Sequence, residues 1–198
     1  LPSFTRRDGG SRLKAGGFTD ADLHIIVPPD APKKGNLVVR LQGTGAKKPL
    51  LLLAHIDVVE AKREDWDFDP FKLQEVNGFF RARGAIDDKS SLIAILEVGE
   101  RIAISGYQPE RTIMFALGPD EEVGGAGGNA TIAKALQARG VRFAWVLDEG
   151  SPILKEPYPG LRNALATVGV AEKGFLTLEL VAHGTGGHRD DRGLEDQL

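Results

Sequence analysis

A continuous apolar run from Leu50 to Ala54 leads directly into His55 and Asp57. A run without polar interruption is typical of a strand buried on both faces, as in a parallel sheet. Because side chains alternate along a strand, we expect His55 and Asp57 on one side at its carboxyl end, where open α/β sheets place their chemistry. The pair is consistent with a metal ligand and its orienting carboxylate, and also with a hydrogen-bonded histidine that closes a strand.

Composition allows a globular core and argues against several classes of partner. The 198 residues are 41% hydrophobic, which suits one domain and part of another. Lysine plus arginine number 25 against 28 acids, which gives a net charge of −3. The sequence has no long basic run, so nucleic acid is not an expected partner. No apolar segment approaches the roughly 20 residues of a membrane span. No signal peptide is visible, but the chain starts at Leu1, so we expect a soluble protein, either cytoplasmic or exported after loss of a leader.

Acidic residues follow three further stretches that read as strands. The stretches are residues 77–84, which read as a hairpin turn and strand, 111–117 and 143–147. The acids after them are Asp87 and Asp88, Asp120 to Glu122, and Asp148 and Glu149. If these strands share one parallel sheet with the leucine run, their acids converge on His55. Taken alone, Asp87 is explained by a helix N-cap and residues 120–122 by a solvated turn.

Converging acids need cations. Like charges about 4 Å apart repel by about 1 kcal/mol per pair in water and by several times more near a protein surface. Without cysteine, a metal must be held by histidine and carboxylates, a set that suits zinc, manganese or cobalt better than calcium. Neighbouring Glu121 and Glu122 are expected to point apart, so that one binds an ion while the other takes a proton from water.

A dinucleotide site is a competing interpretation. Residues 125–130, GAGGNA, fit a glycine-rich fingerprint before a helix, and Asp148 lies about 20 residues further on. However, GPDEEV separates these glycines from the preceding strand and would bring three carboxylates close to a pyrophosphate. The sequence therefore disfavours this function.

Four stretches together carry a family resemblance. LLLLAHIDVVEAKREDWDFDPF, FFRARGAIDDKSS, RTIMFALGPDEEVGG and WVLDEG resemble, in order and spacing, motifs of the aminoacylase/carboxypeptidase-type dimetal amidohydrolases. That family includes Gly-X carboxypeptidase, acetylornithine deacetylase and succinyl-diaminopimelate desuccinylase. The resemblance implies an α/β fold whose mostly parallel central sheet is flanked by helices, a zinc-peptidase-like catalytic domain over residues 1–174. Residues 175–198 would begin a smaller α+β lid domain.

The resemblance also implies a centre of two divalent ions, zinc by preference with cobalt or manganese as alternatives. Asp87 would bridge both ions. The full set of implied ligands is His55, Asp87, Glu122 and Glu149, with Asp148 as the alternative to Glu149.

The catalytic residues that the resemblance implies are Asp57, Glu121 and His188. Asp57 would orient His55, and Glu121 would act as general base. His188 would polarise the scissile carbonyl, often across a homodimer interface formed by the lid, whereas His183 matches no family position. The implied reaction is hydrolysis of an amide bond in a small peptide or an N-acyl amino acid.

The chain departs from the family at its carboxyl end. Residues 164–184 read as two strands, but RDDRGLEDQL follows His188 where the family continues with small residues. Family members also continue through the lid to a second metal-binding histidine. We therefore expect an amino-terminal fragment that binds metal weakly and turns over slowly or not at all. The alternative is a non-catalytic metal-binding fragment that needs another chain to complete its site.

Overall fold

The computed structural model describes residues 6–32, 34–150, 152–171, 176 and 178–181. The chain divides into two compact units, Leu1–Gly150 and Ser151–Leu198. In the described part of the chain, no helix combines the length and apolar character needed to cross a bilayer.

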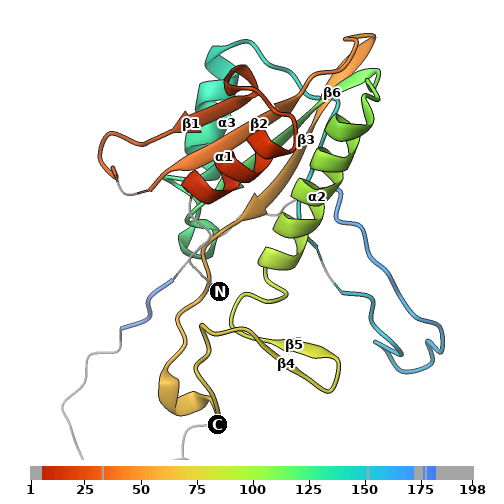
Figure 1. Ribbon diagram of the computed structural model, residues 1–198. Coiled ribbons are helices and arrows are strands. Elements are labelled where there is room, and N and C mark those ends of the chain that lie inside the picture. Colours follow the sequence, from red (N-terminus) through yellow and green to blue (C-terminus); the bar gives the residue numbers. More distant parts are fainter. Residues whose placement is uncertain (1–5, 33, 151, 172–175, 177, 182–198) are drawn as a thin grey trace, which may run out of the picture. The chain divides into compact units, whose positions relative to one another are not determined.

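The first unit is built on a five-stranded sheet in the order β1-β2-β6-β3-β7 (Figure 1). The strands are β1 (Leu23–Ile26), β2 (Asn36–Leu41), β3 (Lys47–His55), β6 (Arg111–Gly118) and β7 (Trp145–Leu147). β3 pairs in parallel with both β6 and β7, whereas β2 runs antiparallel to β1 and β6. The sheet is therefore mixed and mostly parallel, which confirms the α/β expectation.

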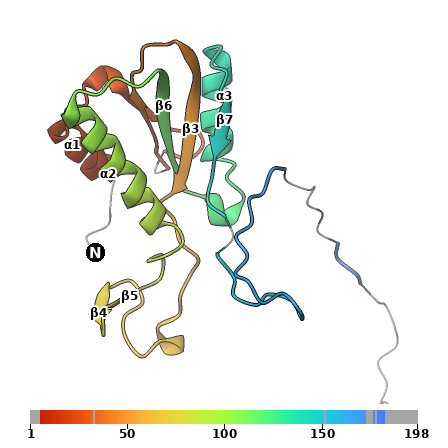
Figure 2. The same ribbon diagram turned by 90° about the vertical axis from the view of Figure 1, so that its right-hand side faces the viewer.

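Helices cover both faces of the sheet, as Figure 2 shows with the sheet seen between them. α1 (Arg6–Ala15) and α2 (Lys89–Ser105) lie on one face, and α3 (Asn129–Ala138) lies on the other. Leu52 and Ala54 of β3 face the first layer, whereas Leu51 and Leu53 face the second. The uninterrupted leucine run thus supplies apolar side chains to both layers, as expected for a strand covered on both sides.

The long connection from β3 to α2 contains a small hairpin. β4 (Gln74–Val76) and β5 (Phe79–Arg81) pair antiparallel around a turn at Asn77 and Gly78, both with positive φ. Asparagine followed by glycine is the sequence that best tolerates positive φ at both turn positions. The hairpin expected before the Asp87 segment is therefore confirmed.

The second unit shows little regular structure in its described residues. Its one described pairing is an isolated antiparallel bridge between Leu154 and Leu165. The two strands expected in residues 164–184 are absent from the described part of that range. Val168, Val170 and Leu180 are more than 80% exposed there, so these apolar side chains lack the neighbouring layer that stabilises a strand. The predicted domain boundary at residue 174 falls outside the described residues and stays a prediction.

Candidate metal centre

The site lies where three parallel strands end side by side. β3 ends at His55, which is paired with Gly118 at the end of β6, and β7 ends at Leu147 beside Leu52. The short η3 helix (Glu121–Val123) follows β6, and Glu149 follows β7. Parallel pairing therefore brings residues 55, 121 and 149 together at the carboxyl ends of the strands. We call these residues, with Asp87 and Glu122 beside them, the acid rim.

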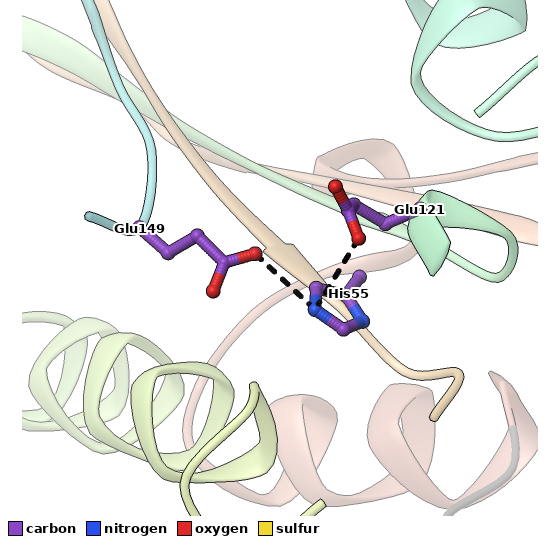
Figure 3. A group of neighbouring side chains, drawn as sticks. All are labelled: His55, Glu121 and Glu149. Atoms are coloured by element: carbon purple, nitrogen blue, oxygen red, sulfur yellow. Dashed lines mark ion pairs between the residues drawn. The ribbon is translucent and has the colours of Figure 1, made fainter. Parts of the chain in front are cut away.

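His55 is the centre of the acid rim, and only 2% of its surface is exposed. Its Nε2 atom lies 2.9 Å from Asp87 Oδ1, 3.2 Å from Glu149 Oε1 and 3.9 Å from Glu121 Oε2. Figure 3 shows the two glutamates approaching the imidazole from different elements. One imidazole nitrogen therefore faces three carboxylates.

Two groups of side chains at the acid rim have the spacing of metal ligands. The first is His55, Glu121 and Glu149, and the second is His55, Asp87 and Glu122. Within each group, one potential ligand atom per residue lies within 4.8 Å of the others. The four residues expected as metal ligands are thus brought together with Glu121, the expected general base.

Asp57 lies at the Nδ1 side of the imidazole, away from the three carboxylates at Nε2, and also binds the loop that carries Glu121 and Glu122. His55 Nδ1 lies 3.1 Å from the Asp57 carbonyl oxygen and 3.4 Å from Asp57 Oδ1. The Asp57 carboxylate accepts the backbone N–H groups of Glu121 and Glu122, at 3.2 and 3.1 Å. With its Nδ1 proton donated to Asp57, the imidazole can present the Nε2 lone pair to an ion. Asp57 therefore contacts both the His55 ring and the backbone of the two glutamates.

Asp88 and Lys89 support the site in ways that the sequence analysis missed. Asp88 is 1% exposed, and its Oδ2 accepts the backbone N–H of His55 at 3.1 Å. It occupies the N-cap position of α2 without a side-chain cap bond. Lys89 Nζ donates to the Ile56 carbonyl at 2.6 Å. Burial lowers the pKa of Lys89, against the opposing charges of Asp57 and Asp88. The available signal was the second aspartate, which a cap alone does not require.

Charge crowding shifts the titration of three groups at the acid rim. Burial lowers the pKa of His55, but its hydrogen bond with Asp87 and the charge of Glu149 contribute to a net rise. Burial raises the pKa of Glu121, and nearby acids add to this against the opposing effect of His55. Burial and then the charge of Asp88 raise the pKa of Glu149. The carboxyl groups of Glu121 and Glu149 therefore resist ionisation where no cation lies beside them.

The donor set fits divalent ions. Acids outnumber basic side chains at the site. The basic side chains are His55 and Lys89, and the acids are Asp57, Asp87, Asp88, Glu121, Glu122 and Glu149. Asp88 Oδ1 is buried and has no hydrogen-bond partner among the described residues. One imidazole nitrogen with several carboxylate oxygens matches the ligands of zinc, manganese and cobalt in proteins.

Of four other acids and histidines named from the sequence, two belong to neither ligand group and two lie outside the described residues. Asp148, the alternative to Glu149, belongs to neither ligand group, and its Oδ1 accepts the backbone N–H of Glu149 at 3.0 Å. Asp120, the first acid of its triplet, is 3% exposed and bonds behind the acid rim to Gly127. His183 and His188 lie outside the described residues, so the expected role of His188 stays a prediction.

Comparison with known proteins identifies the family. Residues 51–172 match the model of peptidase family M20/M25/M40, which is more than half of the chain. The chain is 43% identical over 164 residues to the mouse N-fatty-acyl-amino acid synthase/hydrolase PM20D1, covering 82% of this chain and 33% of that protein. It is 42% identical over 144 residues to the probable carboxypeptidase S-like 2 of Dictyostelium discoideum, covering 71% and 28%. The chain belongs to the peptidase family M20/M25/M40.

Solved structures agree on the fold. The M20 family metallo-carboxypeptidase Sso-CP2 of Sulfolobus solfataricus aligns with a TM-score of 0.56 at 18% identity, covering 74% of this chain and 32% of that one. Human carnosine dipeptidase 1 aligns with a TM-score of 0.54 at 18% identity, covering 74% and 34%. The chain spans about a third of the length of these relatives. The expected amidohydrolase and carboxypeptidase family is therefore confirmed.

Proposed function

We propose that this chain forms the metal-binding part of a hydrolase that cleaves an amide bond in a peptide or an N-acyl amino acid. The observation that carries the proposal is His55 Nε2, which lies among carboxylates from three other segments of the chain in two ligand groups. The names of the relatives, an N-fatty-acyl-amino acid synthase/hydrolase and a carboxypeptidase, support the substrate class.

The proposed centre holds two divalent ions, with zinc as the preferred metal. His55 and Glu149 would hold one ion, Glu122 would hold the other, and Asp87 would be shared by both. His55 belongs to both ligand groups, but its one free nitrogen can bind only one ion, and its 3.2 Å approach to Glu149 supports that pairing. When bound, divalent ions polarise a substrate carbonyl and lower the pKa of bound water towards 7.

Glu121 is the proposed general base. The Asp57 carboxylate holds the Glu121 backbone, and the Glu121 side chain is 47% exposed, which leaves it accessible to water and substrate. A raised pKa brings the carboxylate closer to the pH at which it must both accept and return a proton. Glu121 then takes a proton from the attacking water and delivers it to the leaving nitrogen. His188 is proposed to orient the scissile carbonyl, and a lid-mediated homodimer remains part of this proposal.

A second candidate is a metal-binding fragment without activity of its own. The observation that favours it is the coverage, since the chain spans about a third of its relatives' length. The dinucleotide alternative loses support because the Gly127 N–H, which such a loop would offer to phosphate, donates to Asp120 Oδ2 at 2.8 Å.

Metal content and hydrolysis measured on the same preparations test the proposal. We expect elemental analysis to find up to two divalent ions per chain, with the ion content retained in Glu121→Gln and reduced in the neighbouring Glu122→Gln. We expect any release of amino acid from an N-acyl amino acid by the zinc-loaded chain to be lost in Glu121→Gln. Metal binding without hydrolysis favours the second candidate. A wild-type chain that takes up no ion contradicts both.

A further inference from the structure

Behind the acid rim, a buried polar cluster surrounds the loop that carries Glu121 and Glu122. Asp120 begins this loop, is 3% exposed and belongs to neither ligand group. Its Oδ2 accepts the backbone N–H of Gly127 at 2.8 Å and pairs with Lys34 Nζ at 3.3 Å. The most buried acid of the triplet is thus directed away from the ions' expected position and into the loop.

The main chain of Asp120 closes the same loop from within. Its carbonyl accepts the N–H of Gly125 at 2.7 Å and that of Val123 at 3.4 Å. Side chain and carbonyl together therefore bind three later backbone groups of one short segment. The turn carrying Glu121 and Glu122 is enclosed by these bonds.

Asn36 of β2 binds the same loop through a hydrogen bond to its backbone. This first residue of β2 is fully buried, and its Nδ2 donates to the Gly127 carbonyl at 2.9 Å and to the Ile26 carbonyl at 3.1 Å. Both polar groups of Gly127 are consequently fixed, the N–H by Asp120 and the carbonyl by Asn36. The sheet itself thereby anchors the far end of the loop.

Close packing leaves this arrangement little freedom. A Cβ added at Gly128 would overlap Asp120 Oδ1 and would lie 3.3 Å from Pro119 Cδ. A Cβ added at Gly127 would lie 3.0 Å from Asp120 Oδ2. The two glycines let the backbone fold directly against the carboxylate, so their requirement here is steric rather than nucleotide binding.

From these contacts we propose that Asp120 is a positioning residue for Glu121 and Glu122. Asp57 holds the amides of the two glutamates from the side of His55, and Asp120 holds the loop from the buried side. Between these two anchors, both glutamates bring a carboxylate oxygen to within 4.8 Å of a nitrogen of His55. The inference rests on the proposed function, because the quantity it explains is the placement of a metal ligand and a general base.

Asp120→Asn tests this role, and Asp22→Asn is its matched control. Asp22 also accepts a backbone N–H, from Thr19 at 3.0 Å, and pairs with a cation, Arg40 at 3.4 Å, but it precedes β1 at the opposite end of the sheet from the acid rim. Both substitutions therefore remove a negative charge from a backbone N–H and a cationic side chain, and Asp22 in addition accepts the Thr19 hydroxyl at 2.6 Å. Only the first lies behind Glu122.

The readouts are Zn²⁺ affinity by competition with a chelating dye, the visible spectrum of bound Co²⁺, and the urea midpoint of unfolding. We expect Asp120→Asn to weaken the ion bound by Glu122 by about tenfold and to alter the Co²⁺ spectrum, in the range found for groups that support metal ligands. We expect Asp22→Asn to leave both unchanged. A purely structural role would shift the urea midpoint in both variants and the ion affinity in neither.

Unchanged affinities and an unchanged Co²⁺ spectrum in a folded Asp120→Asn would overturn the role of Asp120 and leave the proposed function standing. If this variant does not fold, Lys34→Met decides, because that side chain is 44% exposed and pairs with the same Asp120 Oδ2 that accepts the Gly127 N–H. A weaker loss in the same direction supports the inference, and no change overturns it. A wild-type chain that binds neither ion overturns the proposed function and this inference with it.

Discussion

Two clusters of acids in the first unit, Leu1–Gly150, have opposite electrostatic character. At the contact between α1 and α2, Arg12 lies 2.8 Å from Glu100 and 2.7 Å from Glu97. The hydrogen bond with Glu100 raises the pKa of Arg12, and Arg101 followed by Arg12 holds the pKa of Glu97 below its usual value. At the acid rim, the pKa values of Glu121 and Glu149 are raised instead.

The two clusters differ in how many cationic side chains the chain itself supplies to balance the acids. The helix cluster has its own cations in the sequence, and the pKa of Glu97 is lowered there by Arg101 and Arg12. The acid rim has more carboxylates than cationic side chains, and a cation from outside the chain would lower the repulsion among them. A carboxylate count alone does not mark a candidate functional site, whereas raised pKa values of Glu121 and Glu149 beside a buried histidine do.

Removing a ligand from the acid rim should have the largest effect. We expect His55→Ala and Asp87→Asn each to weaken zinc binding by more than 100-fold, beyond the 10- to 100-fold typical of groups that only support ligands. Isothermal titration of the purified chain measures this. Arg12→Met is the control from the helix cluster and should bind zinc as the wild type does. Equal binding by His55→Ala would remove the contrast between the clusters.

Added zinc should stabilise the fold through the acid rim. At a free concentration about 100 times the dissociation constant, an ion that binds only the folded chain adds about 2.7 kcal/mol to the free energy of unfolding. Urea unfolding with zinc and with a chelator gives this difference. Arg12→Met should show the same gain, and His55→Ala should show little. A gain retained in His55→Ala would place the binding elsewhere.

Stability without metal should depend on pH in the direction opposite to that of the helix cluster. Glu121, Glu149 and His55 have raised pKa values, so these three groups bind more protons in the folded chain than in the unfolded chain. Their contribution to the free energy of unfolding should therefore fall as pH rises from about 4 to about 8, across the ordinary glutamate and histidine values of about 4.3 and 6.5 and the raised ones above them. Burial lowers the pKa of His24, which contributes with the opposite sign just below about 6.5. Glu97, with a lowered pKa, contributes stability that is lost only as the pH falls below about 4.

Urea midpoints of the metal-free chain across this range test the sign. Glu149→Gln should flatten the slope, because the substituted amide does not titrate. A metal-free chain whose stability rises steadily between pH 5 and pH 8 would contradict the crowding of charge at the acid rim.

The smallest effect is expected at the helix cluster itself. Arg12→Met should lower the free energy of unfolding by about 1 kcal/mol, since the Arg12 side chain is 39% exposed and solvent screens its ion pairs. Chemical unfolding measures the change, with Lys72→Met, which removes an exposed pair with Asp69, as the control expected to change less. A loss of several kcal/mol would mean that the helix cluster, too, is poorly balanced.

The sequence predicted the parts of the site that depend on strand ends. The leucine run, the alternation of His55 and Asp57, and the acids after β6 and β7 follow from periodicity and parallel pairing. The expectation that the strand before Asp87 shares this sheet was wrong, because β5 belongs to the separate hairpin with β4. The hydrophobic pattern did not reveal that β2 runs antiparallel within the sheet, because a buried strand of either direction reads as an apolar run.

Loop geometry set the limit of that prediction. Asp120, Glu121 and Glu122 are adjacent in sequence, yet Asp120 is buried behind the loop while the two glutamates face His55. The direction of each depends on the turn at η3 and on the bonds to Asp57 and Gly127. Tertiary contacts of this kind carry no local sequence signal.

The central claim is that divalent ions hold the acid rim together, and anomalous diffraction from crystals of the zinc-loaded chain tests it most directly. The account predicts two anomalous peaks at the zinc edge, one about 2.0–2.1 Å from His55 Nε2 and both about 2.0–2.2 Å from Asp87 oxygens. Ordered crystals with no zinc peak near His55, or with zinc bound only elsewhere on the chain, would contradict it.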